Sequence, residues 1–276
     1  MAQKKWFITG ISTGLGKALA DEVMEAGDFV IGTLRTQEQV DDFNKTHKDS
    51  AYAIRLDVTR AEDIRNATGV VLEKFTRIDV LVNNAGIGFV GAIEETSSEE
   101  TRAVFDANFF GALELTKAFL PMFRQQKSGH ILQISSHGGI KAFAGFGIYN
   151  ASKFALEGFS EALAQEIQPL GIKLTLVEPG PFRTNFAGTG LGLAKAIIND
   201  YSATAGVFRE RIKSIDGKQE GDPRKAARAI IQIARSANPP LRLVLGKIAI
   251  GTITSKIESL QNDLNLHRDL AASVVY

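Results

Sequence analysis

Short runs of β-branched and other apolar residues alternate along the chain with longer stretches in which apolar residues recur at the period of a helix. This alternation is typical of βαβ units, which build a parallel sheet covered by helices on both faces. Several runs are apolar at consecutive positions, as strands buried on both faces require. The sequence therefore predicts an α/β, doubly wound sheet of seven parallel strands, at residues 5–9, 29–34, 52–56, 78–82, 130–134, 173–177 and 242–245.

The starts of several helices are marked by residues that bind free backbone N–H groups. A Ser or Thr followed three residues later by Glu forms a capping box, and an Asp before a Pro places a cap ahead of the first helical residue. The sequence predicts such helix starts at Thr59 with Glu62, at Ser97 with Glu100, and at Asp222 with Pro223.

No internal repeat, low-complexity tract or flexible linker divides the chain, so we expect a single domain over residues 1–276. The alternation fails only between the sixth strand and the helix after Asp222, over residues 179–221. A connection of about forty residues inside a compact domain is usually functional. Its apolar residues, Phe186 and Phe208 among them, favour a lid over a substrate pocket; the alternative is a helical insertion that only packs on the domain.

The composition removes whole classes of function. The 276 residues carry 32 Lys and Arg against 31 Asp and Glu, a formal net charge of +1, so no nucleic-acid partner is implied. The chain has no Cys, which excludes disulfides, thiolate metal sites and cysteine nucleophiles, and we expect no bound metal and a cytoplasmic location. No apolar run reaches the roughly 18 residues of a membrane span, and the N-terminal run is too short for a signal peptide.

A glycine-rich turn follows the first predicted strand and precedes a helix. In TGISTGLG, residues 9–16, glycines occupy positions 10, 14 and 16. Glycines there permit a tight turn and a close backbone approach to a pyrophosphate, which a helix N-terminus attracts. Taken alone, the turn could equally be structural. It also matches G-x-S-x-G, a hydrolase nucleophile elbow, but such a serine needs a later His, and only His267 follows residue 137, in a polar segment.

Polar side chains stand where further strands end. Asp57 follows the third strand, NNAG at 83–86 follows the fourth, and Ser136 follows the fifth. Tyr149 and Lys153 lie four residues apart at the start of a helix and so share one of its faces. Doubly wound sheets bind ligands at this strand edge. Each motif alone has a structural explanation: a turn for Asp57 or NNAG, and a surface contact for Tyr149 with Lys153.

Together these residues resemble the short-chain dehydrogenase/reductase family, in the family's order and spacing over nearly the whole chain. The resemblance rests on TGISTGLG, NNAG, Asn108, Ser136, Tyr149, Lys153, Pro179-Gly180 and Thr184. The interval of 13 residues from Ser136 to Tyr149 selects that serine over Ser135. The family implies a Rossmann-type fold and hydride transfer between a nicotinamide and a ketone, an aldehyde or a secondary alcohol, as in carbonyl reductases and hydroxysteroid dehydrogenases.

The resemblance also implies catalytic roles for four residues. Tyr149 would exchange a proton with the substrate oxygen, and a cation beside a phenol favours the phenolate, so we expect Lys153 to lower the pKa of Tyr149 from about 10. Lys153 would also hold the nicotinamide ribose. Ser136 would hydrogen-bond the substrate oxygen as charge develops on it. Asn108 would position a water that connects Lys153 to solvent.

Cofactor contacts are implied along the motifs that carry the resemblance. We expect them at Gly10, Ser12, Thr13, Gly14, Leu15, Gly16, Arg35, Asp57, Val58, Asn84, Ala85, Gly86, Tyr149, Lys153, Pro179, Gly180, Phe182 and Thr184. The second strand ends in Thr33-Leu34-Arg35, without the acidic residue that favours NAD. Because Arg35 can pair with a 2′-phosphate, NADP(H) is expected over NAD(H); a solvated Arg is the alternative, and Thr13 stands where some NADP-dependent members carry a basic residue.

Aromatic residues near the site predict an apolar substrate pocket and a bulky, uncharged small-molecule substrate, although sequence alone leaves its identity open. The expected lining is Phe89, His137, Phe143, Phe146 and Phe186. The competing function is a non-catalytic protein that senses NADP(H), which would be expected to have lost Tyr149 or Lys153. A homodimer or homotetramer is expected through the helix at 103–123, whose apolar residues spread too widely for one sheet face to cover and which family members use for association.

Overall fold

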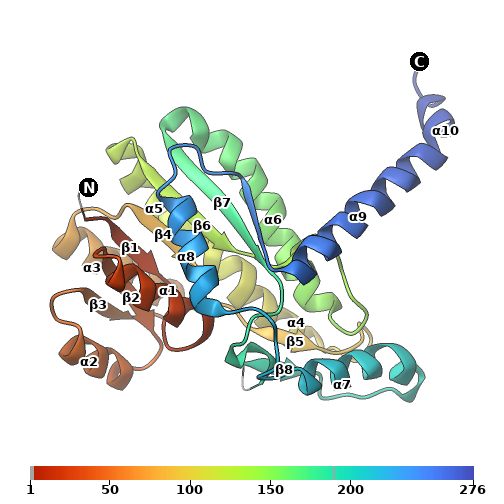
Figure 1. Ribbon diagram of the computed structural model, residues 1–276, viewed down its shortest axis with the longest axis horizontal. Helices are drawn as coiled ribbons and strands as arrows, with labels where there is room; N and C mark the ends of the chain where they lie inside the picture. The colour runs from red at the N-terminus through yellow and green to blue at the C-terminus, as the bar shows by residue number, and fades with distance from the viewer. Residues whose placement is uncertain (1–2, 189) are drawn as a thin grey trace.

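Seven parallel strands form the central sheet, as the sequence predicts (Figure 1). The computed structural model describes residues 3–188 and 190–276. The sheet order is β3-β2-β1-β4-β6-β7-β9, and every neighbouring pair is parallel. In that order the strands are Ala51–Arg55, Phe29–Leu34, Lys5–Ile8, Val80–Asn83, Gly129–Ile134, Ile172–Pro179 and Arg242–Leu245.

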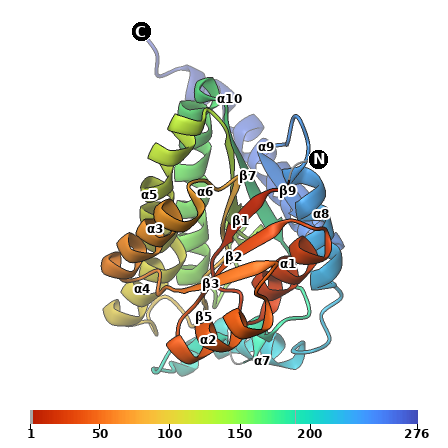
Figure 2. The ribbon, with the colours of Figure 1, turned by 90° about the vertical axis from the view of Figure 1, so that its left-hand side faces the viewer.

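Helices cover both faces of this sheet (Figure 2). Successive residues of a strand point to opposite faces, so in β1 Trp6 and Ile8 pack on one side and Phe7 on the other. The first side carries α1, α2 and α8, at Gly14–Glu25, Gln37–Thr46 and Pro223–Ala234. The second carries α3, α5 and α6, at Ala61–Phe75, Gly111–Gln126 and Gly147–Ile167.

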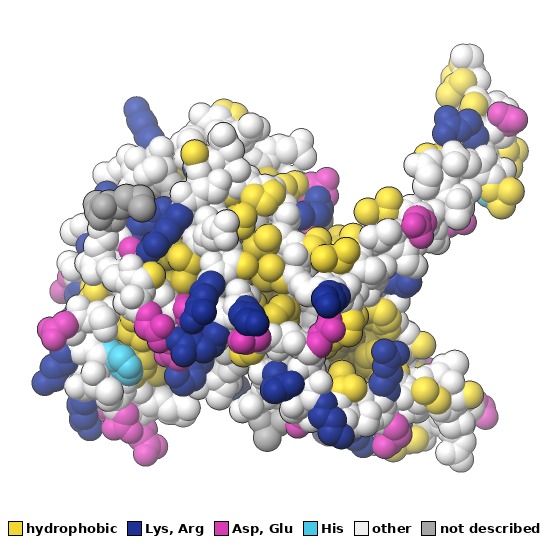
Figure 3. All heavy atoms as spheres, viewed as in Figure 1, with side chains coloured by type: hydrophobic (Ala, Val, Ile, Leu, Met, Phe, Trp, Pro, Cys, Tyr) yellow, Lys and Arg dark blue, Asp and Glu magenta, His cyan; other side chains and the backbone are white. Residues whose placement is uncertain are grey.

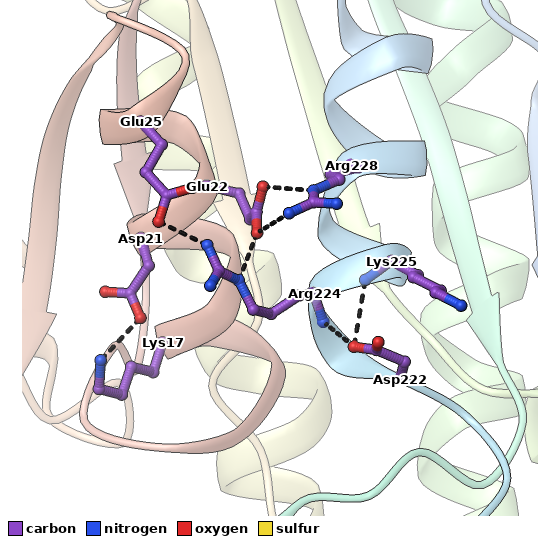
Figure 4. A network of polar contacts seen from close by, with 8 residues as sticks. All are labelled: Lys17, Asp21, Glu22, Glu25, Asp222, Arg224, Lys225 and Arg228. Carbon is purple, nitrogen blue, oxygen red and sulfur yellow. Dashed lines mark hydrogen bonds and ion pairs between the residues drawn. The ribbon is translucent and has the colours of Figure 1, made fainter.

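Two helices on the first face are joined by a carboxylate between two arginines (Figure 4). Glu22 of α1 is buried, and its two oxygens lie 2.5 Å from Arg224 Nε and 2.7 Å from Arg228 Nε of α8. The hydrogen bond from Arg228, followed by the contacts with Arg224, holds the pKa of Glu22 below its ordinary value despite burial. At the start of α8, Asp222 accepts hydrogen bonds from the backbone N–H groups of residues 224 and 225, which confirms the predicted cap.

The other two predicted helix starts had different outcomes. At α4, Ser98–Phe105, Ser97 and Glu100 form the predicted capping box. The prediction for Thr59 is wrong, because α3 begins after Arg60 and the Thr59 hydroxyl donates instead to the Asp57 carboxylate at 2.8 Å. A hydrogen bond from the hydroxyl to a charged carboxylate is stronger than the bond that the hydroxyl would accept from the backbone N–H of residue 62 in a capping box.

A π-helical turn at Asp106–Phe110 joins α4 to α5 and makes one long helix of them. Leu115 and Phe119 of this helix are buried against the sheet, whereas the Phe110 side chain is 48% exposed. One sheet face therefore leaves part of the helix's apolar surface uncovered, as the sequence indicates.

Short elements fill the connection at 179–221, of which residue 189 lies outside the described residues. Strand β8 pairs in parallel with β5, and a short helix, α7, follows. Their bounds are Leu191–Leu193 for β8, Gly88–Val90 for β5 and Val207–Ser214 for α7. Single turns of 3-10 helix lie at His137–Gly139, Gln168–Leu170, Asn185–Ala187 and Asn199–Tyr201, and a second π-helical turn lies at Ser202–Gly206.

The chain ends in a helix that leaves the body of the protein, α9 at Lys247–Leu266, followed by α10 at Arg268–Ala272 (Figure 1). No helix among the described residues has both the length and the apolarity needed to cross a bilayer.

Candidate active site

The glycine-rich turn lies between β1 and α1, next to the point where the strand order reverses between β1 and β4. Gly14 has a φ of +64°, which only glycine adopts without strain, and a Cβ on Gly16 would collide with the Asn84 side chain. The cap residue of α1, Thr13, makes no side-chain bond to the helix, and the first turn of this helix holds no acidic residue. Its free N–H groups and partial positive charge suit a pyrophosphate.

NNAG braces this turn from the end of β4. The Thr9 hydroxyl accepts hydrogen bonds from the backbone N–H groups of Asn84 at 2.8 Å and Ala85 at 2.9 Å. The Asn84 amide in turn donates to the Thr9 carbonyl at 2.8 Å. These bonds bring the two predicted cofactor motifs together at one edge of the sheet.

Asn108 lies in the π-helical turn, where such an irregularity often marks a functional position. Asn108 Oδ1 accepts a hydrogen bond from the Ile87 N–H at 2.7 Å, and Asn108 Nδ2 donates to the Ile87 carbonyl at 2.9 Å. The same Nδ2 also donates to the Ser152 hydroxyl. A Cβ on Gly86 would lie 2.9 Å from Asn108 Oδ1 and 3.7 Å from Lys153 Nζ. The missing side chain of Gly86 therefore leaves open the space between Asn108 and Lys153.

Ser136, Tyr149 and Lys153 converge on one buried spot, as the sequence predicts. Lys153 Nζ donates to the Ile134 carbonyl at 2.9 Å and lies 5.9 Å from the centre of the Tyr149 ring. Ser136 Oγ accepts from the Gly138 N–H at 2.9 Å, and Ser136 acts to lower the pKa of Tyr149. Ser136 follows the end of β6, whereas Tyr149 and Lys153 lie in the first two turns of α6.

Burial governs the ionisation of this group. It raises the pKa of Tyr149 to about 12, with the Ser136 hydrogen bond acting in the opposite direction. It lowers the pKa of Lys153 to about 8, against the attraction of Glu157. The pKa of Tyr149 is therefore raised in this structure instead of lowered as expected, because desolvation is the dominant effect on it.

Aromatic side chains surround Tyr149. Phe146 stacks on its ring with centroids 4.2 Å apart, and Phe186 meets it edge-on at 5.6 Å. Phe143 joins the same cluster, and the half-buried His137 lies 5.3 Å from Phe143. These four residues are among the five that the sequence predicts to line a substrate pocket.

Phe89, the fifth residue expected in this lining, lies elsewhere. Strand residues alternate in direction, so Val90 of β5 packs beside Tyr149 while Phe89 packs with Val104 and Ala194 on the other side. Val90, rather than the expected Phe89, therefore packs in the aromatic cluster with Tyr149.

The remaining cofactor candidates line the same edge. Arg35 is exposed at the end of β2 and makes no ion pair with the described residues. The Asp57 carboxylate accepts from the Thr59 N–H, and Val58 lies beside Gly111 of α5. The other candidates lie in two segments, with Gly10, Ser12 and Leu15 in or next to the glycine-rich turn and Pro179, Gly180, Phe182 and Thr184 at and after the end of β7. The Thr184 side chain lies next to Gly14, which brings the two segments together.

Sequence analysis missed a group of acids around Arg242, of which Glu157, one helical turn beyond Lys153, and Glu178 of β7 are buried. Arg242 Nε of β9 lies 3.4 Å from Glu157 and 3.2 Å from Glu178, and its Nη2 lies 2.9 Å from Glu161. Burial, and then the neighbouring Glu157, raises the pKa of Glu178 to about 7, although Arg242 acts against this. An acid inside the apolar run LTLVEP, residues 174–179, was the signal that could have revealed it.

The raised pKa of Glu178 predicts a pH-dependent stability. The folded protein holds a proton there that the unfolded chain releases near pH 4.5, so stability should fall as pH rises from about 4.5 to 7 and stay lower above that. Glu178→Gln removes this cost, and we expect it to stabilise the protein by about 2 kcal/mol at pH 8 but by little at pH 5. Urea unfolding at both pH values measures the difference. Glu161→Gln, an exposed neighbour of the same arginine, is the control, and an equal gain at both pH values would contradict the prediction.

Known proteins resemble this chain over most of its length. A family model described as short chain dehydrogenase matches residues 4–190. Oxidoreductase BOA17 of Botryotinia fuckeliana is 41% identical over 248 residues, 90% of each chain, and the 3-ketodihydrosphingosine reductase of Bacteroides thetaiotaomicron is 38% identical over 244 residues, 87% of each chain. The crystal structure of a short-chain dehydrogenase from Streptomyces avermitilis is 42% identical, with a TM-score of 0.93 and 100% of both chains covered.

The doubly wound sheet and these likenesses define an oxidoreductase. The chain belongs to the short-chain dehydrogenase/reductase family, as the sequence motifs indicate. Solved structures of this fold hold NAD in a Burkholderia phymatum protein and NADP in ElxO.

Proposed function

We propose that the protein is an NADP(H)-dependent oxidoreductase that interconverts a bulky, apolar ketone or aldehyde and the corresponding alcohol. The observation that carries the proposal is the convergence of Ser136, Tyr149 and Lys153 at the sheet edge that also holds the glycine turn. Loss of Tyr149 or Lys153 would favour a sensor without catalysis, but both side chains are present and buried in this group.

Each residue of the group has a chemical task in this proposal. The nicotinamide, when bound, supplies or takes up the hydride at the substrate carbon. Tyr149 donates the proton to the resulting alkoxide oxygen, and Ser136 donates a hydrogen bond to the same oxygen while its charge develops. Lys153 stabilises the phenolate left on Tyr149 and holds the nicotinamide ribose, and Asn108 positions a water that returns the proton through the space beside Gly86.

The dinucleotide fits the strand edge. The pyrophosphate would lie on the free N–H groups of α1 between Gly10 and Gly16, and the adenosine ribose would lie at the end of β2. Arg35 stands there exposed, so its guanidinium is available to a 2′-phosphate, and this supports NADP(H).

The cofactor preference predicts that Arg35→Asp weakens NADPH binding about tenfold or more, because the change removes a phosphate partner and adds a repelling charge. NADH binding should improve, since a carboxylate can accept bonds from the ribose hydroxyls. Fluorescence titration of wild type and variant with both cofactors measures this. Lys48→Asp, at an exposed lysine before β3, controls for charge alone, and an unchanged NADPH affinity in Arg35→Asp would show a merely solvated arginine.

The aromatic surroundings of Tyr149 support an apolar substrate, and one relative is named for a 3-keto substrate. We expect kcat/KM to rise along a series of ketones with lengthening alkyl chains, because each well-buried methylene adds up to about 0.8 kcal/mol of binding. Oxidation of NADPH followed by absorbance measures it. A falling series, or a preference for small charged keto acids, would remove the apolar pocket, whereas no turnover of any ketone, aldehyde or alcohol with either cofactor would overturn the function itself.

Two further expectations form part of this proposal. The exposed Phe110 of the long helix and Phe154 of α6, 41% exposed, offer an apolar surface for self-association of the body. The location of the enzyme would be cytoplasmic, in keeping with a chain that has no Cys.

A further inference from the structure

The C-terminal helix α9 projects from the body with little to cover it (Figure 1). Among the described residues, only its first three turns touch the domain: Ala249 is fully buried, Ile253 is half-buried, and Ser255 accepts a hydrogen bond from Lys141. Every residue from 257 to 276 is exposed. A lone helix of this length is marginal in water, so the free part of α9 requires a partner.

Apolar residues form a narrow stripe along this helix. They recur at alternating intervals of three and four residues, at Ile250, Ile253, Ile257, Leu260 and Leu264. This 3.5-residue period is that of a coiled-coil seam, in which one helix packs against another. Ile253 is half-buried against the body while Ile250 is 56% exposed, so the stripe starts at the edge of the contact with the body and continues outward. Figure 3 shows apolar side chains along the projecting helix.

The charges at the end of the chain favour a protein partner over a lipid surface. From residue 247 onward, Lys247, Lys256 and Arg268 balance Glu258, Asp263 and Asp269. A helix that lies on a membrane carries an excess of Lys and Arg on its polar face, which this one lacks. A helix with equal numbers of positive and negative side chains can pair its charges with those of another such helix.

The pattern is self-complementary in one orientation. If two copies of α9 run antiparallel, Ile257 packs on the partner's Leu260, and Ile253 packs on the partner's Leu264. Lys256 then flanks the partner's Asp263, and the twofold axis repeats this pair. A parallel pair would instead leave Lys256 beside an uncharged Gln261 and would pair Asp263 only with Arg268, which lies beyond the end of α9.

We propose that two copies of the protein associate through an antiparallel coiled coil of their α9 helices. The seam is Ile250 to Leu264, and the paired charges of Lys256 and Asp263 set its register. This interface is separate from the long helix that holds Phe110, so it can join two monomers or two dimers.

The first experiment measures the mass of the full-length protein by light scattering. Ile257→Asp places a charge in the seam and is expected to halve the mass of the wild-type particle. Leu266→Asp is the matched control: Leu266 is also exposed but lies outside the stripe, so its mass should equal that of the wild type. Equal masses for Ile257→Asp and the wild type would overturn the proposal.

A charge swap tests the register. Lys256→Glu and Asp263→Lys each turn two attractive pairs into two repulsive ones and should weaken the association about tenfold. The double variant restores both pairs and should recover most of the wild-type dissociation constant, measured by dilution. In a parallel coil Asp263→Lys would face Arg268, and the second change would not rescue it, so a missing rescue overturns the antiparallel register.

The absence of native Cys makes cross-linking unambiguous. Ile257→Cys protein mixed with Leu260→Cys protein should form a mixed disulfide on mild oxidation, because these positions face each other in the proposed seam. Each variant alone should cross-link far less. Efficient disulfides within either single variant and none in the mixture would indicate a parallel pair and contradict the proposal.

Discussion

Replacing Tyr149 by Phe is expected to lower kcat by about 10²- to 10⁴-fold, because it removes the group that exchanges a proton with the substrate oxygen. The aromatic ring remains, so its stacking on Phe146 and its edge contact with Phe186 are kept. NADPH affinity should therefore change by less than about threefold. Stopped-flow or steady-state assays, together with a cofactor titration, measure the two effects separately.

Lys153→Ala provides the comparison for this variant. Lys153 is placed to act on both the phenol and the nicotinamide ribose, so its loss should reduce turnover and cofactor affinity together. Phe146→Leu, a change beside the same ring that leaves the hydroxyl in place, controls for packing. A Tyr149→Phe enzyme that keeps more than about a tenth of the normal kcat would remove Tyr149 from the proton-transfer role.

Removing the carboxylate of Glu95 by the change Glu95→Ala is expected to destabilise the protein by about 3 to 5 kcal/mol, because it leaves a buried arginine without its partner. Glu95 Oε2 lies 2.6 Å from Arg209 Nη2, and both side chains are nearly covered. Although burial acts to raise it, hydrogen bonds from the backbones of Ile198 and Ala92 and the charge of Arg209 hold the pKa of Glu95 below its ordinary value. Thermal and urea unfolding measure the loss.

The controls for Glu95 separate a buried charge from an ordinary contact. Glu94 is exposed and accepts a hydrogen bond from Tyr201, which lies in the same connection as Arg209. Glu94→Ala should therefore lower the free energy of unfolding by less than about 1 kcal/mol. The double change of Glu95→Gln with Arg209→Met removes both charges and should recover much of the stability. A loss below about 1 kcal/mol for Glu95→Ala would mean that residues 179–221 are held only loosely. The predicted large loss instead favours a segment that is anchored to the domain by the ion pair of Glu95 with Arg209.

The strands of the sheet could be predicted because burial on both faces leaves a direct mark, a run of apolar residues with no alternation, as in Phe29–Leu34. The candidate site could be located because its residues follow the strand ends in a fixed order, from Gly10 to Lys153. Neither inference needed side-chain packing. Both depend on short motifs, each of which can be recognised within a few consecutive residues.

What sequence could not supply depends on contacts between distant segments. Strand β5 has three residues, too few for an alternating pattern, so nothing indicated that Val90 rather than Phe89 faces Tyr149. The pKa of Tyr149 depends on how deeply several elements bury it, which no local pattern reports. The contact of Arg242 with Glu178 joins β9 to β7, and neither residue marks the other in the sequence.

The open space beside Gly86 bears on how the protein tolerates random substitution. Any side chain at that position would project between Asn108 and Lys153, while a Cβ at Gly158, on α6, meets no atom within 4 Å. A side chain is therefore sterically excluded at Gly86 but has free space at Gly158. Drift at Gly158 should pass almost unnoticed, or even strengthen its helix, whereas a single methyl group at Gly86 would close the gap that separates the amide from the ammonium group.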